Sequence, residues 1–256
     1  MSASSPRLAL VTGASAGFGR AIAAALCRDG WTVIGAARRE DRLRDVRQEL
    51  GASFHPLELD VTSPASVERA ALQVEKEFPS GLDLLVNNAG LALGVKPAQQ
   101  ADVQDWESMI QTNVMGLSRM VHRFLPDMVA RDRGHVVNIG SVAGNYAYPG
   151  GNVYGATKAF VKQLSLGLRA DLHGTRVRVT NIEPGLVGGT EFSRVRLHGD
   201  QARAAAVYEN VEALQPEDIA EAVVWAANQP ARVNINIIEI MPVAQSLVGT
   251  RLHRTS

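Results

Sequence analysis

A tyrosine and a lysine stand four residues apart within the stretch NVYGATKAF at residues 152–160. On a helix this spacing places Tyr154 and Lys158 on one face, one turn apart. A free phenol has a pKa of about 10, which is too high for proton exchange at neutral pH, and a neighbouring ammonium lowers it. A shift of about three units takes about 4 kcal/mol, which a buried ammonium and a cofactor's charge supply together. Because any amphipathic helix accepts such a pair, its meaning depends on the rest of the chain.

The composition indicates an ordinary globular protein. The chain has 256 residues, 46% hydrophobic and 20% charged, which suits one large α/β domain or two small ones. Its 26 basic and 26 acidic residues balance, so we expect neither a nucleic-acid nor a membrane partner. Cys27 is the only cysteine, which excludes a disulfide within the chain. With no signal-peptide pattern and no apolar run of membrane-spanning length, we expect a cytoplasmic protein, and we expect no metal site.

Short β-branched or leucine-rich runs alternate with longer helical patterns. Strands are predicted at residues 8–12, 32–36, 53–58, 82–87, 135–139, 176–182 and 235–240. Helices are predicted at residues 18–29, 40–50, 66–78, 103–131, 154–172 and 217–227. Ser63 and Pro64 introduce the third helix as cap and first residue, and Pro126 is expected to kink or end the fourth. The alternation predicts a mostly parallel sheet covered by helices on both faces, in a single domain over residues 1–256.

A glycine-rich turn, TGASAGFG at residues 12–19, joins the first strand to the first helix. Gly13, Gly17 and Gly19 let the backbone approach a pyrophosphate, which then sits on the helix N-terminus. The spacing is G-x-x-x-G-x-G rather than the general G-x-G-x-x-G. The same turn also matches the G-x-S-x-G nucleophile elbow of α/β-hydrolases, with Ser15 as nucleophile. That alternative fits less well, because an elbow follows a central strand and has no use for Gly19.

The second strand is followed by two arginines, about twenty residues after the glycine turn. A chain that binds NAD offers an acidic residue to the ribose hydroxyls at this place. Arg38 and Arg39 instead suit a 2′-phosphate, with which a guanidinium pairs well. Both arginines also suit a solvated helix start, but their position beside the ribose favours NADP(H) as the cofactor.

Three more motifs follow in order: NNAG at residues 87–90, Asn113 in the long helical stretch, and Gly140-Ser141 after the fifth strand. Together with the glycine turn, the Tyr154/Lys158 pair and Pro184-Gly185, they resemble the short-chain dehydrogenase/reductase family from Leu8 to about Ile240. The resemblance implies a Rossmann-type, doubly wound parallel sheet of seven strands. It also sets the core at residues 8–240 and leaves residues 241–256 as a C-terminal tail.

The resemblance implies a role for each matching residue. Tyr154 is the expected acid and base, Lys158 binds the nicotinamide ribose, and Ser141 holds the substrate oxygen. Asn113 is expected to place a water in a proton relay. The expected cofactor-binding residues are Gly13, Ser15, Gly17, Phe18, Gly19, Arg38, Arg39, Asp60, Val61, Asn87, Ala89, Gly90, Tyr154, Lys158, Pro184, Gly185, Val187 and Thr190.

One departure from the family pattern concerns the loop PGLVGGT at residues 184–190. The family places a threonine slightly closer to the Pro-Gly pair, and an extra glycine is inserted here. The sequence therefore leaves open whether Val187 or Thr190 meets the nicotinamide carboxamide.

A narrower resemblance lies in the last third of the chain. Residues 152–160, DLHG at 171–174, EPGLVGGTEF at 183–192 and the tail from VNIN at 233–236 onward resemble the bacterial NADP-dependent 3-hydroxy acid dehydrogenases. These enzymes, of the serine 3-dehydrogenase and allo-threonine dehydrogenase type, act on serine, allo-threonine and related short 3-hydroxy acids. They reduce semialdehydes such as malonic semialdehyde. The resemblance implies a small-molecule substrate of this class, 3-hydroxypropionate included, and a homotetramer.

A 3-hydroxy acid needs a partner for its carboxylate. Arg194 and Arg196 follow the Pro-Gly loop and are the expected substrate-binding residues together with Ser141 and Tyr154; Arg251 and Arg254 in the tail are further candidates. The tail also carries Leu247, Val248 and Leu252, so we expect it to pack against a neighbouring subunit.

Two other functions stay open beside this one. A general NADPH-dependent reductase of ketones or sugars would share every motif but need no carboxylate. A non-catalytic nucleotide-binding regulator would keep the fold without turnover, and the intact set of Ser141, Tyr154, Lys158 and Asn113 argues against it.

Overall fold

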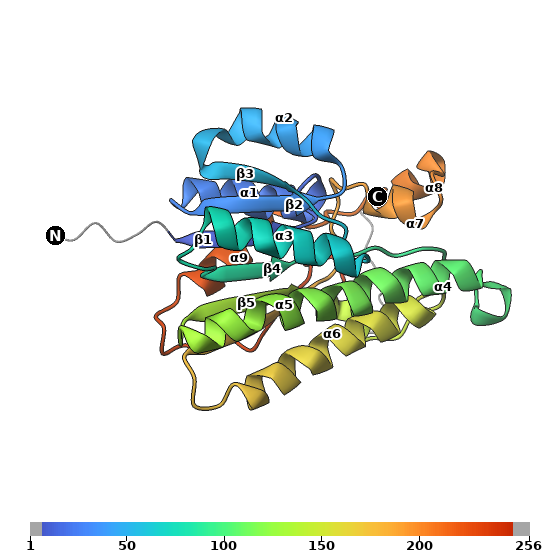
Figure 1. The fold of residues 1–256 in the computed structure, drawn as a ribbon. Coiled ribbons are helices and arrows are strands. Elements are labelled where there is room, and N and C mark those ends of the chain that lie inside the picture. The colour runs from blue at the N-terminus through green and yellow to red at the C-terminus, as the bar shows by residue number, and fades with distance from the viewer. Residues whose placement is uncertain (1–6, 248–256) are drawn as a thin grey trace.

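The computed structural model describes residues 7–247 and shows the predicted alternation of strands and helices (Figure 1). The strands are β1 (Leu8–Thr12), β2 (Thr32–Ala37), β3 (Phe54–Glu58), β4 (Leu84–Asn87), β5 (Gly134–Ile139), β6 (Val177–Pro184) and β7 (Ile237–Ile240). The helices are α1 (Gly17–Arg28), α2 (Glu40–Leu50), α3 (Pro64–Glu77), α4 (Val103–Ile110), α5 (Leu117–Ala130), α6 (Asn152–Asp171), α7 (Phe192–Arg196), α8 (Gln201–Ala206) and α9 (Pro216–Ala227). Only the short helices α7 and α8 are absent from the predicted set.

The strands form one parallel sheet in the order β3-β2-β1-β4-β5-β6-β7, a seven-stranded arrangement within the described residues. From β1 the chain first proceeds to one edge through β2 and β3, and then returns to β4 on the other side. Neighbouring crossovers therefore leave the carboxyl ends of β1 and β4 in opposite directions, which opens a crevice there. The predicted α/β, single-domain Rossmann-type fold is confirmed.

Alternate residues along each strand enter two separate cores, one on each face of the sheet. Leu8 and Leu10 of β1 join a cluster with apolar residues of α3, α5 and α6. Ala9 and Val11 join a second cluster with residues of α1, α2 and α9. Figure 1 shows α3, α5 and α6 on the near face of the sheet and α1 and α9 on the far face. Burial on both faces explains why the strands are almost wholly apolar.

Local capping explains where α3 begins. The Ser63 hydroxyl accepts a hydrogen bond from the backbone N–H of Ser66 at 3.3 Å, and Pro64 occupies the first helical position. This is the predicted arrangement, in which the cap residue accepts from one free backbone N–H of the first turn and the proline has no N–H that needs a partner.

The long helical stretch from Val103 differs from expectation. Pro126 does not end it, since α5 continues to Ala130. The interruption comes earlier, where residues 111–116 form a π-helical turn, η3 (Gln111–Gly116), between α4 and α5. A π-turn keeps the helix axis continuous while it inserts an extra residue, so hydrophobic periodicity does not reveal it.

Three other sequence expectations concern membrane-spanning helices, metal ligands and the C-terminal tail. Among residues 7–247 no helix is long and apolar enough to cross a membrane. The same residues contain no group of three or more histidine, cysteine or acidic side chains placed to hold a metal ion. Val248, Arg251, Leu252 and Arg254 lie outside the described residues.

Candidate active site

A cavity of about 790 Å³ lies at the carboxyl ends of the strands. It runs from the glycine turn after β1, past the ends of β4 and β5, to α6 and the segment after β6. Most of the predicted site residues line it: Gly13, Ser15, Gly17, Phe18, Arg38, Arg39, Asp60, Val61, Ala89, Gly90, Ser141, Tyr154, Lys158, Pro184, Gly185, Val187, Thr190 and Arg196. The four that do not line it are Gly19, Asn87, Asn113 and Arg194.

The glycine turn fits close approach of an anionic group. Gly13 and Gly17 have φ angles of +70° and +51°, which side chains rarely adopt. A Cβ at Gly19 would lie 2.3 Å from the Gly13 carbonyl oxygen, so Gly19 serves the packing of α1 rather than the cavity wall. Ala16 gives α1 no side-chain cap. The N-terminal amides of α1 are therefore left for an anion such as a pyrophosphate.

The turn after β4 is tied to β1 by residues that sequence reasoning left out of the site. The Thr12 hydroxyl accepts the backbone N–H of Asn88 and of Ala89, each at 2.9 Å. The Asn88 side chain donates to the Thr12 carbonyl at 2.8 Å. These bonds hold Ala89 and Gly90 at the cavity wall. Because residues 12 and 88 are far apart in sequence, only the predicted adjacency of β1 and β4 could have suggested the contact.

Asn87 does not line the cavity, and its expected contact with the cofactor stays a prediction. Its side chain is buried in the sheet and donates to Asn138 Oδ1 of β5 at 2.9 Å. Successive residues at a strand end point to opposite sides, and Asn88 is the one that faces the cavity.

Asp60 and Val61, the expected adenine contacts, line the cavity beyond the end of β3. Asp60 Oδ1 accepts hydrogen bonds from Thr62, from the backbone at 2.9 Å and from the hydroxyl at 2.7 Å. Val61 packs against Gly116, where a Cβ would come within 2.7 Å of it. These contacts fix the turn against the N-terminal end of α5.

The two arginines after β2 differ in their surroundings. Both line the cavity, but Arg38 forms no hydrogen bond or ion pair with the described residues. Arg39 donates to the Ser15 hydroxyl at 3.3 and 3.2 Å and forms an ion pair with Glu191 at 2.9 Å. Ser15 is therefore an acceptor at the rim of the turn, without the histidine partner that a hydrolase nucleophile needs among the described residues.

Tyr154 and Lys158 lie together on α6, almost fully buried. The Lys158 ammonium donates to the Ile139 carbonyl at 2.8 Å and lies 5.9 Å from the centre of the Tyr154 ring. Burial lowers the pKa of Lys158 to about 8. Burial also raises the pKa of Tyr154 to about 12, and nearby Tyr148 adds to the rise.

Burial therefore opposes the expected lowering of the phenol pKa, and a lowering by the ammonium and a cofactor's charge together stays a prediction. Desolvation of the phenolate exceeds the opposing effects, which are a hydrogen bond with Ser141 and the charge of Arg196. Ser141 stands at the end of β5, where its hydroxyl accepts from Ala143 N at 3.1 Å and donates to the Pro184 carbonyl at 3.4 Å. The hydroxyl and the phenol together face one point of the cavity.

Asn113 sits in the π-turn and holds the loop after β4. Its amide donates to the Leu91 carbonyl at 2.8 Å and to Thr157 at 3.0 Å, and its oxygen accepts from Leu91 N at 2.9 Å. The side chain therefore joins this loop to α6 at Thr157, the residue directly before Lys158. The predicted water relay stays a prediction.

The loop after β6 folds back over the glycine turn. Thr190 lies over Gly17, with its methyl carbon 3.5 Å from where a Cβ would be, while Val187 is buried at a bridge to Leu214. Leu186 N donates to Gln245 Oε1 of the C-terminal tail at 2.7 Å, a contact not foreseen. Both Val187 and Thr190 line the cavity, so the choice between them for the carboxamide stays open.

The structure distinguishes the two arginines of α7. Arg194 does not line the cavity and pairs with Glu191 at 2.6 Å. Arg196 lines the cavity, with its guanidinium 5.7 Å from the centre of the Tyr154 ring and 5.4 Å from that of Tyr148. It donates to the Gly94 carbonyl at 3.2 Å and has no carboxylate partner among residues 7–247.

The substrate side of the cavity also contains aromatic residues that were not predicted. Phe192 meets Tyr154 edge to face with ring centres 5.8 Å apart. Tyr148 lies under Arg196, and Tyr208 of the segment after α8 bonds Ser193 at 2.6 Å. These rings close the cavity around the phenol, which is why Tyr154 is so deeply buried.

Comparison with known proteins gives consistent results. Residues 7–200 match the short chain dehydrogenase family. The NADP-dependent 3-hydroxy acid dehydrogenase YdfG of Escherichia coli K12 is 54% identical over 247 residues, which cover 96% of this chain and 99% of that protein. The serine 3-dehydrogenase of Agrobacterium fabrum is 47% identical over 247 residues, 96% of this chain and 98% of that protein. A solved structure described as the closed form of serine dehydrogenase complexed with NADP+ has a TM-score of 0.93 and 54% identity, and covers 97% of this chain and 100% of that one.

Proposed function

The chain belongs to the short-chain dehydrogenase family, and from that premise we propose that it is an NADP-dependent dehydrogenase of short 3-hydroxy acids. In this proposal it interconverts the C3 hydroxyl of acids such as serine, allo-threonine or 3-hydroxypropionate with the corresponding carbonyl. The observation that carries the substrate class is Arg196, a cation without a carboxylate partner in the described residues, close to the Tyr154 phenol.

The cavity fits NADP(H) at its other end. The uncapped N-terminus of α1 and the positive φ angles of Gly13 and Gly17 suit a pyrophosphate, and Arg38 is free to pair with a 2′-phosphate. When bound, the nicotinamide accepts or supplies the hydride. Arg39 and Ser15 complete the rim of the phosphate site.

The protein's own residues handle the proton and the substrate's orientation. Tyr154 exchanges the proton of the C3 oxygen, and Ser141 donates a hydrogen bond to the same oxygen. Lys158 is held near the phenol by the Ile139 carbonyl, and in this proposal its charge together with that of the bound cofactor favours the ionised form of Tyr154. Asn113 fixes the loop that borders Lys158.

Arg196 supplies both affinity and orientation in this proposal. A guanidinium binds a carboxylate through two parallel hydrogen bonds, which fixes the acid's direction as well as its position. With the carboxylate on Arg196, the C3 hydroxyl of a short acid faces Tyr154 and Ser141. A substrate without a carboxylate loses this anchor.

A substrate panel tests the proposal. Purified protein is mixed with NADP+ and each of serine, allo-threonine, 3-hydroxypropionate and 2-propanol, and the absorbance of the reduced nicotinamide is followed. We expect turnover of the acids with a higher kcat/KM than for 2-propanol. Preference for the uncharged alcohol would replace this proposal with the general carbonyl reductase, and no turnover of any substrate would favour the non-catalytic regulator.

The assembly and location implied by the sequence resemblance also stay proposals. We propose a homotetramer, which light scattering on the purified protein would test, and a cytoplasmic location. The role of the C-terminal tail at a subunit interface belongs to the same proposal.

A further inference from the structure

We infer that Glu183, Lys162 and Asn145 form a positioning triad that holds the turn carrying Ser141 against the helix carrying Tyr154. The inference rests on the proposed dehydrogenase function, because Ser141 and Tyr154 are the groups that it positions. None of the three residues lines the main cavity, so each acts through its neighbours and none is a catalytic residue.

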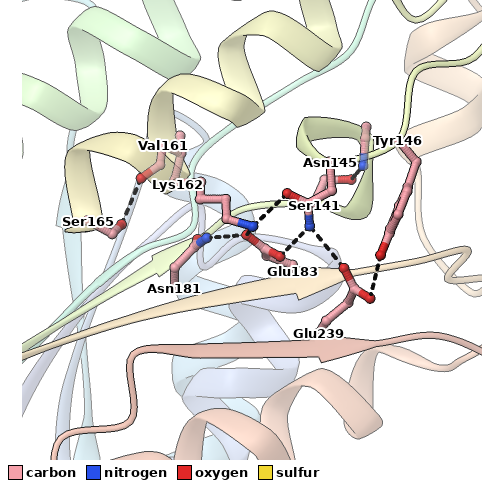
Figure 2. Close-up of polar contacts among 10 residues, drawn as sticks. Ser141, Asn145, Tyr146, Val161, Lys162, Ser165, Asn181, Glu183 and Glu239 are labelled. Carbon is pink, nitrogen blue, oxygen red and sulfur yellow. Dashed lines mark hydrogen bonds and ion pairs between the residues drawn. The ribbon is translucent and has the colours of Figure 1, made fainter. Parts of the chain in front are cut away.

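The Asn145 amide is the centre of the triad (Figure 2). Its oxygen accepts from the Lys162 ammonium at 2.8 Å. Its nitrogen donates to Glu183 Oε2 at 2.6 Å and to Glu239 Oε2 at 2.9 Å. Both amide hydrogens and the oxygen are thus used, and the partners come from α6, β6 and β7. An amide bonded on all sides by charged groups has one allowed orientation.

Asn145 is close to Ser141 in the chain and in space. The turn Val142–Gly144 lies between them, and the Asn145 backbone N–H donates to the Val142 carbonyl at 2.9 Å. The turn rests directly on α6, because a Cβ at Gly144 would lie 2.7 Å from the Lys158 carbonyl carbon. Fixing the Asn145 amide therefore fixes the turn at the end opposite Ser141.

Lys162 continues the face of α6 that carries the proposed catalytic pair. It lies one helical turn beyond Lys158 and two beyond Tyr154, at the spacing that places side chains on one side of a helix. Lys158 binds the end of β5 through the Ile139 carbonyl, and Lys162 binds the turn that follows through Asn145. One helix face thus anchors both the strand and the turn on either side of Ser141.

Glu183 connects the triad to the segment that follows β6. Its carboxylate is 1% exposed and accepts from Asn181 at 2.7 Å as well as from Asn145, with the Lys162 ammonium 3.6 Å away. The next residue, Pro184, accepts a hydrogen bond from the Ser141 hydroxyl at 3.4 Å. The end of β6 is therefore connected to Ser141 in two ways. Pro184 accepts a hydrogen bond from Ser141 directly, and Glu183 is connected to it through Asn145 and the intervening turn.

A contribution to folding stability does not by itself explain the buried charge of Glu183. Replacing a buried ion pair by apolar residues of similar volume is often neutral or stabilising, so such pairs are weak evidence for a purely structural role. The triad instead fixes the orientation of the turn that carries Ser141. This orientation matters because a catalytic group displaced by about 1 Å costs about a hundredfold in rate.

The test uses Glu183→Gln and Lys162→Met in the full-length protein, each alone and combined with Ser141→Ala. We expect each variant to lower kcat about tenfold in the wild-type background, while the Kd for NADP(H) stays within about twofold. In the Ser141→Ala background the same changes should have little further effect on kcat, because the group that they position is gone. Lys162→Arg, which keeps a donor to Asn145, should restore most of the activity. Glu68→Gln is the matched control, an exposed carboxylate paired with Arg123 away from the site.

Three results would overturn the inference: kcat of both variants equal to that of Glu68→Gln, an equal loss in both backgrounds, or a loss of NADP(H) binding that accounts for the loss of turnover. If Glu183→Gln fails to fold, Asn145→Ala, at a partly exposed position, tests the same triad. All ratios are measured on whichever panel substrate the wild type turns over fastest. A wrong substrate class therefore shows in the wild-type panel, and a wrong triad shows in the variant ratios.

Discussion

Arg39 and Glu191 form an ion pair, with Nη1 2.9 Å from Oε2, that joins the segment after β2 to the segment before α7 at the lining of the main cavity. Arg39 precedes α2 beside the proposed 2′-phosphate site, and Glu191 precedes α7, which carries Arg196. The side chains are 44% and 31% exposed, so the pair contributes at most about 1 kcal/mol to stability. The guanidinium can therefore exchange this carboxylate for a phosphate at small cost.

Cofactor preference should depend on the arginines after β2. We expect Arg38→Ala and Arg39→Ala each to weaken NADP(H) binding about ten- to a hundredfold, since a charge-assisted bond to phosphate contributes about 1.5–3 kcal/mol. NAD(H) binding should change little. Kd values from nicotinamide fluorescence check this, with Arg44→Ala as the control, an exposed arginine paired with Glu40 within α2. Equal losses for both cofactors would contradict the assignment.

Turnover should depend on the Tyr154 hydroxyl. Tyr154→Phe keeps the ring, its contact with Phe192 and the helix, and removes only the exchangeable proton. We expect kcat to fall far below a tenth of the wild-type value, a loss greater than about 1.4 kcal/mol, with the Kd for NADP(H) unchanged. If a tenth or more of kcat survived in steady-state assays, another group would be the acid.

Much of the fold was predictable because its strands are buried on both faces and bounded by strong local signals. The glycine turn and the Ser63-Pro64 start of α3 are examples in which a few adjacent residues decide the structure. The short helices α7 and α8 were not predictable, since a few polar-rich residues carry no clear period. The π-turn around Asn113 was missed because one inserted residue hardly disturbs the pattern of a long helix.

The candidate site was predictable where adjacent residues suffice and not where the tertiary fold decides. The Tyr154/Lys158 pair is a matter of helical spacing alone. Whether Asn87 or Asn88 faces the cavity depends on the register with β5, which no local pattern gives. The raised pKa of Tyr154 depends on how deeply the surrounding rings bury the phenol. The contact of Asn145 with Glu183 joins residues 38 positions apart in the chain.

Stability at mildly acid pH should be limited by His135, a fully buried residue of β5. Since the Thr180 hydroxyl donates to the Ile235 carbonyl, His135 Nε2 is the donor to Thr180 at 2.8 Å, and Nδ1 has no partner. Burial lowers the pKa of His135 to about 3, with the charge of Arg178 adding to the effect. Below pH 6.5 the unfolded chain binds a proton that the folded protein does not, so stability falls as pH falls toward 3.

The size of this effect can be measured with one variant. Between pH 7 and pH 5 the histidine should cost about 2 kcal/mol of unfolding free energy, at about 1.4 kcal/mol for each pH unit below 6.5. His135→Gln, which cannot take up the proton, should lose about that much of the pH dependence in urea unfolding. The same difference between pH 7 and pH 5 in both proteins would show that another group is responsible. His173→Gln, an exposed histidine, is the control.

Substrate choice should depend on Arg196 and not on Arg194, although the two lie on the same short helix. Arg196→Ala removes the carboxylate anchor proposed above and should lower kcat/KM for serine or 3-hydroxypropionate about ten- to a hundredfold. Arg194→Ala, which breaks only the exposed pair with Glu191, should change it little. The charge of Arg196 also lowers the pKa of Tyr154, an effect common to every substrate. The ratio of kcat/KM for acid to that for 2-propanol cancels this common effect, so it isolates the carboxylate contact. We expect this ratio to fall strongly in Arg196→Ala and to stay near the wild-type value in Arg194→Ala. An unchanged ratio in both variants would place the carboxylate site elsewhere.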